Sequence, residues 1–312
     1  MGFIFGHFVW HFVISIHREF PSIGAIFSQS MLESKNITLK SFENENKIIF
    51  SGGSNLAYGI NCKKLTKSLN IPVINYGCMV GLGPEIIFEN MKHHLNENDK
   101  VIFCWEYETY LFERKNRNLN YLGMIEGPQN SVIQNFPFYD RVSLRLYFPI
   151  SLIRFSIFSM LNSDRNIDKI YKCGWKFDEL GNVTSNVGIQ IQDRELLATP
   201  SKALVNKIKI NDDLYEIMRE VKNFAELRNI ELYATWPNIF KHPKYSSNRL
   251  VKQNFETIRE FWQNLKIPMI GNPYETMYSS EYFYDSLYHL NQEGVSQRTS
   301  KLLDQLSDFS VK

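Results

Sequence analysis

The sequence predicts an α/β fold in which a mostly parallel sheet of five strands lies between two layers of helices. Two observations lead to this prediction. Short apolar runs alternate with stretches of helical periodicity along the chain, which is typical of a parallel sheet covered on both faces. The alternation stops between the third and fourth runs, over residues 110–202. We therefore expect a three-layer sandwich that carries a long insertion after its third strand.

The first block of this alternation holds three predicted strands. Short apolar runs place them at residues 47–53, 72–77 and 99–105. Leucine and isoleucine recur at near-helical spacing over residues 56–69, so a helix should follow the first strand. Pro84 should begin the next helix, because its missing N–H costs nothing in a first helical turn.

The second block resumes the alternation after the insertion. Its predicted elements are a helix at 203–228, a strand at 230–236, a helix at 248–265, a strand at 267–270 and a last helix at 292–306. Asn291 stands where the N-cap of that last helix is expected. Five strands separated by helices in this order fit a flavodoxin-like sheet, in which sites form outside the carboxyl ends of the strands.

We divide the chain into an N-terminal apolar segment, residues 1–40, and an α/β domain, residues 41–312, that includes the insertion. Residues 3–16 are apolar but too short to span a bilayer comfortably. They are interpreted as the remnant of a membrane anchor, an uncleaved signal anchor, or a helix packed on the domain. Residues 144–161 are apolar with two arginines, which suits either a surface facing a partner or membrane or a helix closing over the core.

Composition and spacing argue against several classes of function. A formal net charge of +2, with scattered Lys and Arg, gives no field suited to nucleic acid. Cys62, Cys78, Cys104 and Cys173 form no C-x-x-C pair and are interpreted as free thiols. The histidines show no metal-ligand spacing, and no complete nucleotide fingerprint is present. We expect no metal, no cofactor and no nucleic-acid partner.

The sequence Gly52-Gly53-Ser54-Asn55 lies between the first strand and the following helix. Glycines allow a sharp turn there, and the first amides of a helix can stabilise a developing oxyanion. Ser54 is therefore a candidate nucleophile. The alternative is that it only caps the helix.

Asp285 and His289 stand four residues apart, directly before the last helix. Such a pair can project to one side of a turn, so that Asp285 orients the imidazole and His289 takes the proton of Ser54. The alternative for the pair alone is a surface ion pair. The combination with Ser54 favours a Ser-His-Asp triad.

These motifs resemble the SGNH (GDSL-like) hydrolase superfamily. Ser54 matches its nucleophile after the first strand, Gly77 its glycine after the second, and Asp285 with His289 its C-terminal pair. The resemblance implies an oxyanion hole made by the Ser54 and Gly77 amides. A third donor would be Asn55, Asn75 or a tyrosine, unless the hole has only two donors.

The chain departs from the family's pattern at three places. Gly-Gly-Ser replaces Gly-Asp-Ser, and D-x-x-x-H replaces D-x-x-H. After the third strand, Trp105-Glu106-Tyr107-Glu108 stands where the family has Gly-x-Asn-Asp. We expect Glu106 and Tyr107 to line the pocket, and we interpret Glu106 as a structural acceptor for backbone amides rather than a catalytic group.

The resemblance implies a serine esterase or O-acyltransferase that acts on acyl, in particular acetyl, esters of carbohydrate through an acyl-enzyme. It is nearest to divergent bacterial members associated with envelope-polysaccharide modification. It therefore favours the cell envelope over the cytoplasm, with a membrane or a membrane acyltransferase as partner. The alternative is a non-catalytic binding or assembly module in polysaccharide biosynthesis.

Overall fold

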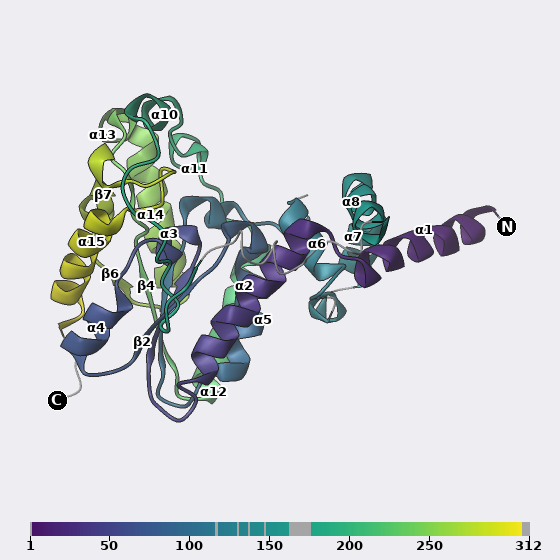
Figure 1. Ribbon diagram of the computed structural model, residues 1–312, viewed down its shortest axis with the longest axis horizontal. Helices are drawn as coiled ribbons and strands as arrows, with labels where there is room; N and C mark the ends of the chain where they lie inside the picture. Colours follow the sequence, from purple (N-terminus) through teal and green to yellow (C-terminus); the bar gives the residue numbers. More distant parts are fainter. Residues whose placement is uncertain are drawn as a thin grey trace.

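The computed structural model describes residues 2–115, 118–129, 131–136, 138–146, 148–161 and 176–307. Its centre is a parallel sheet of five strands in the order β2-β1-β3-β4-β6 (Figure 1). These strands are β1 (Ile48–Gly52), β2 (Val73–Gly77), β3 (Lys100–Cys104), β4 (Glu231–Thr235) and β6 (Met269–Ile270). The predicted flavodoxin-like α/β fold is thereby confirmed, and each predicted strand contains the observed one.

The register of the three central strands brings their carboxyl ends to one level. Gly52 of β1 pairs with Gly77 of β2 on one side and with Cys104 of β3 on the other. The residues that directly follow these strands therefore share one edge of the sheet, where open α/β sheets form their sites.

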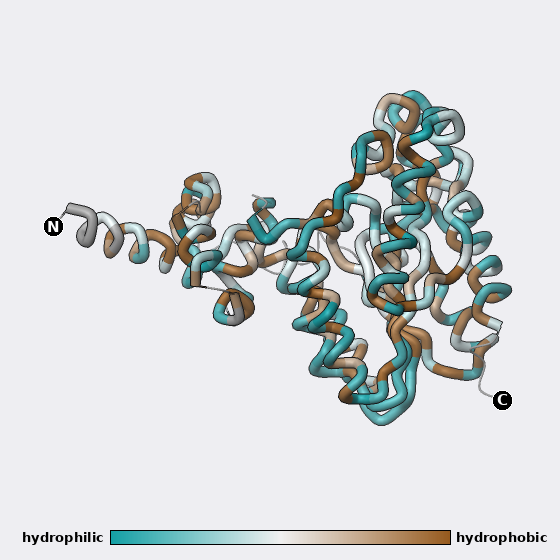
Figure 2. The backbone as a smooth tube through the Cα atoms, turned by 180° about the vertical axis from the view of Figure 1, so that it is seen from behind, coloured by the Kyte–Doolittle hydropathy of each residue, from teal (hydrophilic) through white to brown (hydrophobic). Residues whose placement is uncertain are grey.

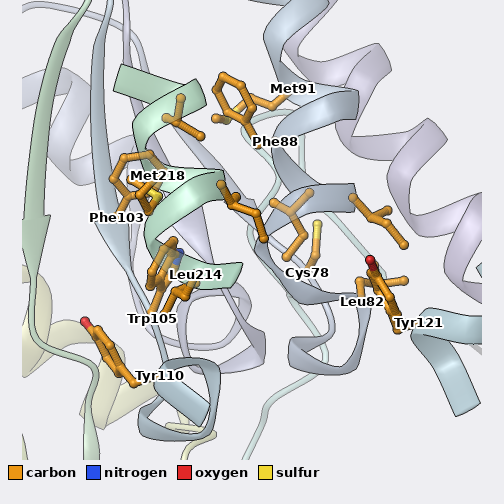
Figure 3. Close-up of a cluster of buried hydrophobic side chains, with 14 of the residues drawn as sticks. Cys78, Leu82, Phe88, Met91, Phe103, Trp105, Tyr110, Tyr121, Leu214 and Met218 are labelled. Atoms are coloured by element: carbon orange, nitrogen blue, oxygen red, sulfur yellow. The ribbon is translucent and has the colours of Figure 1, made fainter. Parts of the chain in front are cut away.

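One face of the sheet is covered by α2 (Ile23–Lys40), α5 (Gly83–Met91), α12 (Asp212–Leu227) and α14 (Arg249–Asn264). The close-up in Figure 3 shows part of this core: Phe103 and Trp105 face Leu214 and Met218 of α12, with Phe88 and Met91 of α5 nearby. Pro84 stands in the first turn of α5, as predicted.

The other face is covered by α3 (Ser54–Ala57), α4 (Cys62–Leu69) and α15 (Gln292–Gln305). The helix predicted over residues 56–69 is thus two helices. They are separated at Gly59, whose added Cβ would lie 2.1 Å from the Asn55 carbonyl oxygen. Asn291 caps α15 as predicted, because its side chain accepts from the Gly294 N–H.

Further short elements lie in the second half of the chain. They are α11 (Lys202–Val205), α13 (Pro243–Ser247), η5 (Pro273–Thr276), η6 (Ser280–Tyr282) and a small parallel sheet of β5 (Ile239–Phe240) with β7 (Met277–Tyr278). The helix predicted over 203–228 is therefore split into α11 and α12. The two strands of the small sheet were not predicted, because two residues are too few to show a periodicity.

The insertion is built of short helices rather than strands of the main sheet over the residues that the structure describes. Its elements are η3 (Tyr107–Leu111), α6 (Leu119–Ile125), η4 (Val132–Asn135), α7 (Phe138–Leu146), α8 (Ile150–Leu161) and α10 (Asp193–Ala198). Between β2 and β3 lie η1 (Val80–Leu82) and η2 (Lys92–His94). Cys173 lies outside the described residues, whereas the other three cysteines are buried free thiols, as expected.

The N-terminal segment, residues 1–40, forms α1 (Gly2–Glu19) and α2, of which α2 packs on the sheet. In Figures 1 and 2, α1 projects from the α/β body, with α7 and α8 beside its C-terminal half. Of the helices that the structure describes, none combines the length and apolar character needed to cross a bilayer.

Candidate active site

Ser54 is held by a buried carboxylate. It is the first residue of α3, it follows β1 after Gly53, and it is partly exposed. Its Oγ donates to Glu106 Oε1 over 2.8 Å, and the same oxygen accepts from the Asn55 N–H over 2.8 Å. One carboxylate oxygen thus holds both the candidate nucleophile and the amide that follows it.

The sheet register explains why these residues meet. Gly52 and Cys104 are paired on adjacent parallel strands, and Ser54 and Glu106 each stand two residues beyond them. Glu106 is 3% exposed. Burial raises the pKa of its carboxyl group, while the hydrogen bonds from Asn55 and Ser54 and the charge of His289 act in the opposite direction.

Glu106 also explains the glycine at position 53. A Cβ added to Gly53 would lie 2.7 Å from Glu106 Oε1, closer than packed atoms allow. The aspartate of a Gly-Asp-Ser motif has no room beside this carboxylate. Gly53 and Glu106, which account for two of the three departures from the SGNH pattern, are therefore one coupled feature.

The predicted acid and histidine are brought together. His289 Nδ1 and Asp285 Oδ1 are 2.6 Å apart. They lie on a reverse turn closed by the antiparallel bridge between Phe283 and Leu290. The imidazole stacks on the ring of Tyr58, with 4.1 Å between centroids and 9° between planes. Since Tyr58 is the C-cap of α3, this stacking ties the histidine to the helix that begins at Ser54.

The predicted oxyanion donors are engaged inside the protein. The Gly77 N–H donates to Asn75 Oδ1 over 2.9 Å. Asn75 Nδ2 donates to the Leu56 carbonyl and to Asn182 Oδ1, while Asn55 Nδ2 points to Cys104 Sγ. These N–H groups already donate hydrogen bonds to other atoms of the protein. The structure therefore does not support the prediction that they form an oxyanion hole. The Ser54 amide, in the first turn of α3, remains the candidate donor.

Tyr107, which was predicted to line the pocket, packs in the core. It is fully buried, and its ring lies 5.8 Å from that of Phe255. Glu108 instead reaches a cavity of about 250 Å³ at this end of the sheet, which Gly81 and Phe112 also line. Its carboxylate accepts from Ser201 and Tyr288. Glu108, two positions after Glu106, therefore lines this cavity.

A buried arginine was missed by the sequence analysis. Arg298 of α15 is 1% exposed. Its guanidinium donates to the Asn55 carbonyl, the Trp236 carbonyl, Cys104 Sγ and Asn238 Oδ1. It therefore positions α3 against the ends of β3 and β4. An arginine in an amphipathic helix gives no sequence signal of burial, because its position in the core depends on tertiary packing.

The residues that the structure describes contain no group of three or more His, Cys, Asp or Glu side chains suited to a metal ion. Comparison with protein-family models gives no match to any family. A search of curated proteins gives no match either.

Proposed function

We propose that this protein is a serine esterase or O-acyltransferase that uses Ser54 as its nucleophile. Two observations carry the proposal: Ser54 is hydrogen-bonded to the buried Glu106 carboxylate, and the Asp285–His289 pair stacks on Tyr58, the C-cap of the helix that begins at Ser54. A serine needs a neighbouring base to attack an ester, and the base needs an orienting partner. In this proposal the loop that carries Asp285 and His289 supplies the base and its orienting partner, and the first residue of α3 supplies the serine.

In the first half of the proposed reaction, Ser54 Oγ attacks the carbonyl carbon of an acyl ester and gives its proton to a base. The tetrahedral intermediate then expels the alcohol, which takes that proton, and an acyl-serine remains. In the second half, water or a sugar hydroxyl attacks the acyl-serine and loses its proton to the base. Ser54 takes the proton back as the acyl group departs.

His289 is the proposed base. Because Asp285 holds Nδ1, the nitrogen presented for proton transfer is Nε2. Glu106 has a separate task, which is to hold the Ser54 hydroxyl and the Asn55 amide in the resting site. An ionised carboxylate beside a developing oxyanion would raise the barrier. The raised pKa of Glu106 reduces that penalty, because its protonated form is easier to reach.

The proposed substrate is an acyl ester of carbohydrate, and the cell envelope is the proposed location. Both rest on the resemblance to SGNH hydrolases. A cavity of about 330 Å³ beside Tyr58 is consistent with a hydroxyl-rich ligand. Its lining includes the polar side chains of Asn61, Asp178, Asn182 and Thr184.

A fluorophosphonate probe tests the proposal. An activated serine displaces fluoride from such a probe and forms a stable P–O bond. We expect peptide mapping by mass spectrometry to find the label on Ser54, and we expect Ser54→Ala to abolish it. Labelling of Ser54 that does not depend on His289 would remove the histidine from the mechanism. An unlabelled Ser54 in a folded protein would contradict the proposal.

A second candidate function is a non-catalytic binding or assembly module. It is favoured by one observation: Glu106 and Asn75 already accept the hydrogen bonds of the Asn55 and Gly77 amides. A protein whose amide donors are already bonded to its own side chains can keep this fold without catalysing ester cleavage. The module would bind an acylated polysaccharide without turnover, whereas the enzyme would release the acyl group.

A further inference from the structure

The helices α1, α7 and α8, here called the apolar arm, expose an unusual number of large apolar side chains. Phe12 of α1 is 69% exposed, Phe138 of α7 is 75% exposed, and Ile150 and Leu161 of α8 are 68% and 72% exposed. Other exposed apolar residues of the arm are Phe8, Val9, Tyr139, Leu146, Phe155, Ile157, Phe158 and Met160. A contiguous apolar patch on a soluble protein marks an interaction surface.

Helix α8 is apolar around most of its circumference. Leu152, Ile153 and Ser156 form its buried side. Ile150 and Leu161 lie on the opposite side, and the helical repeat of 3.6 residues spreads the remaining exposed apolar residues between the two sides. A helix that is apolar all round is normally enclosed by a protein core or by lipid. Here only one side of α8 is enclosed.

The arm is a folded unit, because buried polar contacts join its helices to each other and to α6. His17 of α1 contacts Ser156 of α8 through Nδ1 and the Gly123 carbonyl of α6 through Nε2. The buried carboxylate of Glu126 pairs with Arg18 of α1 and Arg145 of α7. These contacts fix which sides of the helices face outward. The exposed apolar side chains therefore face outward in the folded arm.

We propose that the apolar arm docks on the surface of a lipid bilayer. The exposed apolar residues of α8 face several directions, and lipid at a bilayer surface can fit around them, whereas a protein partner covers mainly one side of a helix. Helix α8 contains no acidic residue, and its Arg154 is exposed among the apolar side chains. A guanidinium there can reach lipid phosphates while its stem stays among apolar groups. The α/β body would remain outside the bilayer.

Vesicle flotation tests this inference with the intact protein. The vesicles would contain phosphatidylcholine and phosphatidylglycerol, and the test variant is Ile150→Glu/Leu161→Glu. Its matched control is Leu197→Glu/Leu227→Glu, which makes the same change at two exposed leucines of the α/β body. Equal thermal unfolding midpoints for the variants and the parent protein would show that folding is retained.

We expect the parent protein and the control to float with the vesicles. The bound fraction of the arm variant should fall at least tenfold, because two carboxylates would have to enter the apolar boundary of the bilayer. A parent protein that stays unbound would overturn the inference. An arm variant that binds as well as the control would also overturn it. So would a parent protein that forms a dimer without vesicles, if the arm variant is monomeric. The proposed esterase activity is tested independently of bilayer binding, since it is measured on a soluble ester.

Discussion

A Cβ on Gly53 would lie 2.7 Å from Glu106 Oε1, the oxygen that accepts both the Ser54 hydroxyl and the Asn55 amide. The backbone of Gly53 is extended, with φ −85° and ψ −164°, so an alanine there is excluded by contact and not by conformation. The Glu106 carboxylate can therefore occupy this position only because residue 53 has no side chain.

Gly53→Ala should lower the free energy of unfolding by about 1–3 kcal/mol, because the added methyl group overpacks the site. The same substitution in a Glu106→Ala background should cost almost nothing, since the carboxylate is no longer there. Urea unfolding of the four proteins measures this coupling. Gly6→Ala, where a Cβ meets nothing within 4 Å, is the control and should be neutral or slightly stabilising. An equal cost of Gly53→Ala in both backgrounds would show that the two residues are not coupled.

Glu106 gives a pH dependence of stability whose sign follows from its raised pKa. The folded protein binds the proton of this carboxyl more tightly than the unfolded chain does. The stability of the parent protein relative to Glu106→Gln should therefore fall as pH rises from about 4.5 through the raised pKa, and should then stay level. Chemical unfolding of both proteins at several pH values measures this difference. A difference that grows with pH would mean that the folded state favours the ionised form.

Asp285→Asn should lower the rate of ester hydrolysis less than His289→Ala does. The asparagine has no charge, and its amide can favour the tautomer that protonates Nε2, but the imidazole remains, whereas alanine removes the base altogether. Steady-state rates on a small acetyl ester give the comparison. Because Tyr58 stacks on His289, thermal melting of both variants is needed to separate lost chemistry from lost packing. Equal rates for His289→Ala and the parent protein would exclude the histidine as base.

The sequence predicted the fold well because the strands are buried on both faces and read as apolar runs. Ile48–Gly52 and Lys100–Cys104 lie within runs of this kind. The break between α3 and α4 at Gly59 was missed, since the leucines on both sides keep a nearly continuous helical spacing. Local spacing cannot show that the backbone of Asn55 approaches Gly59.

The candidate site was predicted in part. The Asp285–His289 pair follows from its spacing, and the structure has the contact. Glu106 was predicted to accept hydrogen bonds from backbone amides, and it accepts one from the Asn55 N–H, whereas its hydrogen bond with the Ser54 hydroxyl was not predicted. The burial of Arg298 depends on side-chain packing between distant segments, which no sequence pattern records, whereas the bond from the Gly77 N–H to Asn75 is a local contact two residues apart that was missed.

The role of Ser54 as nucleophile is tested by the rate at which Ser54→Ala hydrolyses p-nitrophenyl acetate. Ser68→Ala, which changes an exposed serine of α4, is the matched control. We predict that Ser54→Ala lowers kcat by at least about a thousandfold while it still unfolds in one cooperative transition, and that Ser68→Ala retains full activity. Turnover by Ser54→Ala equal to that of the parent protein would contradict the assignment of Ser54 as nucleophile.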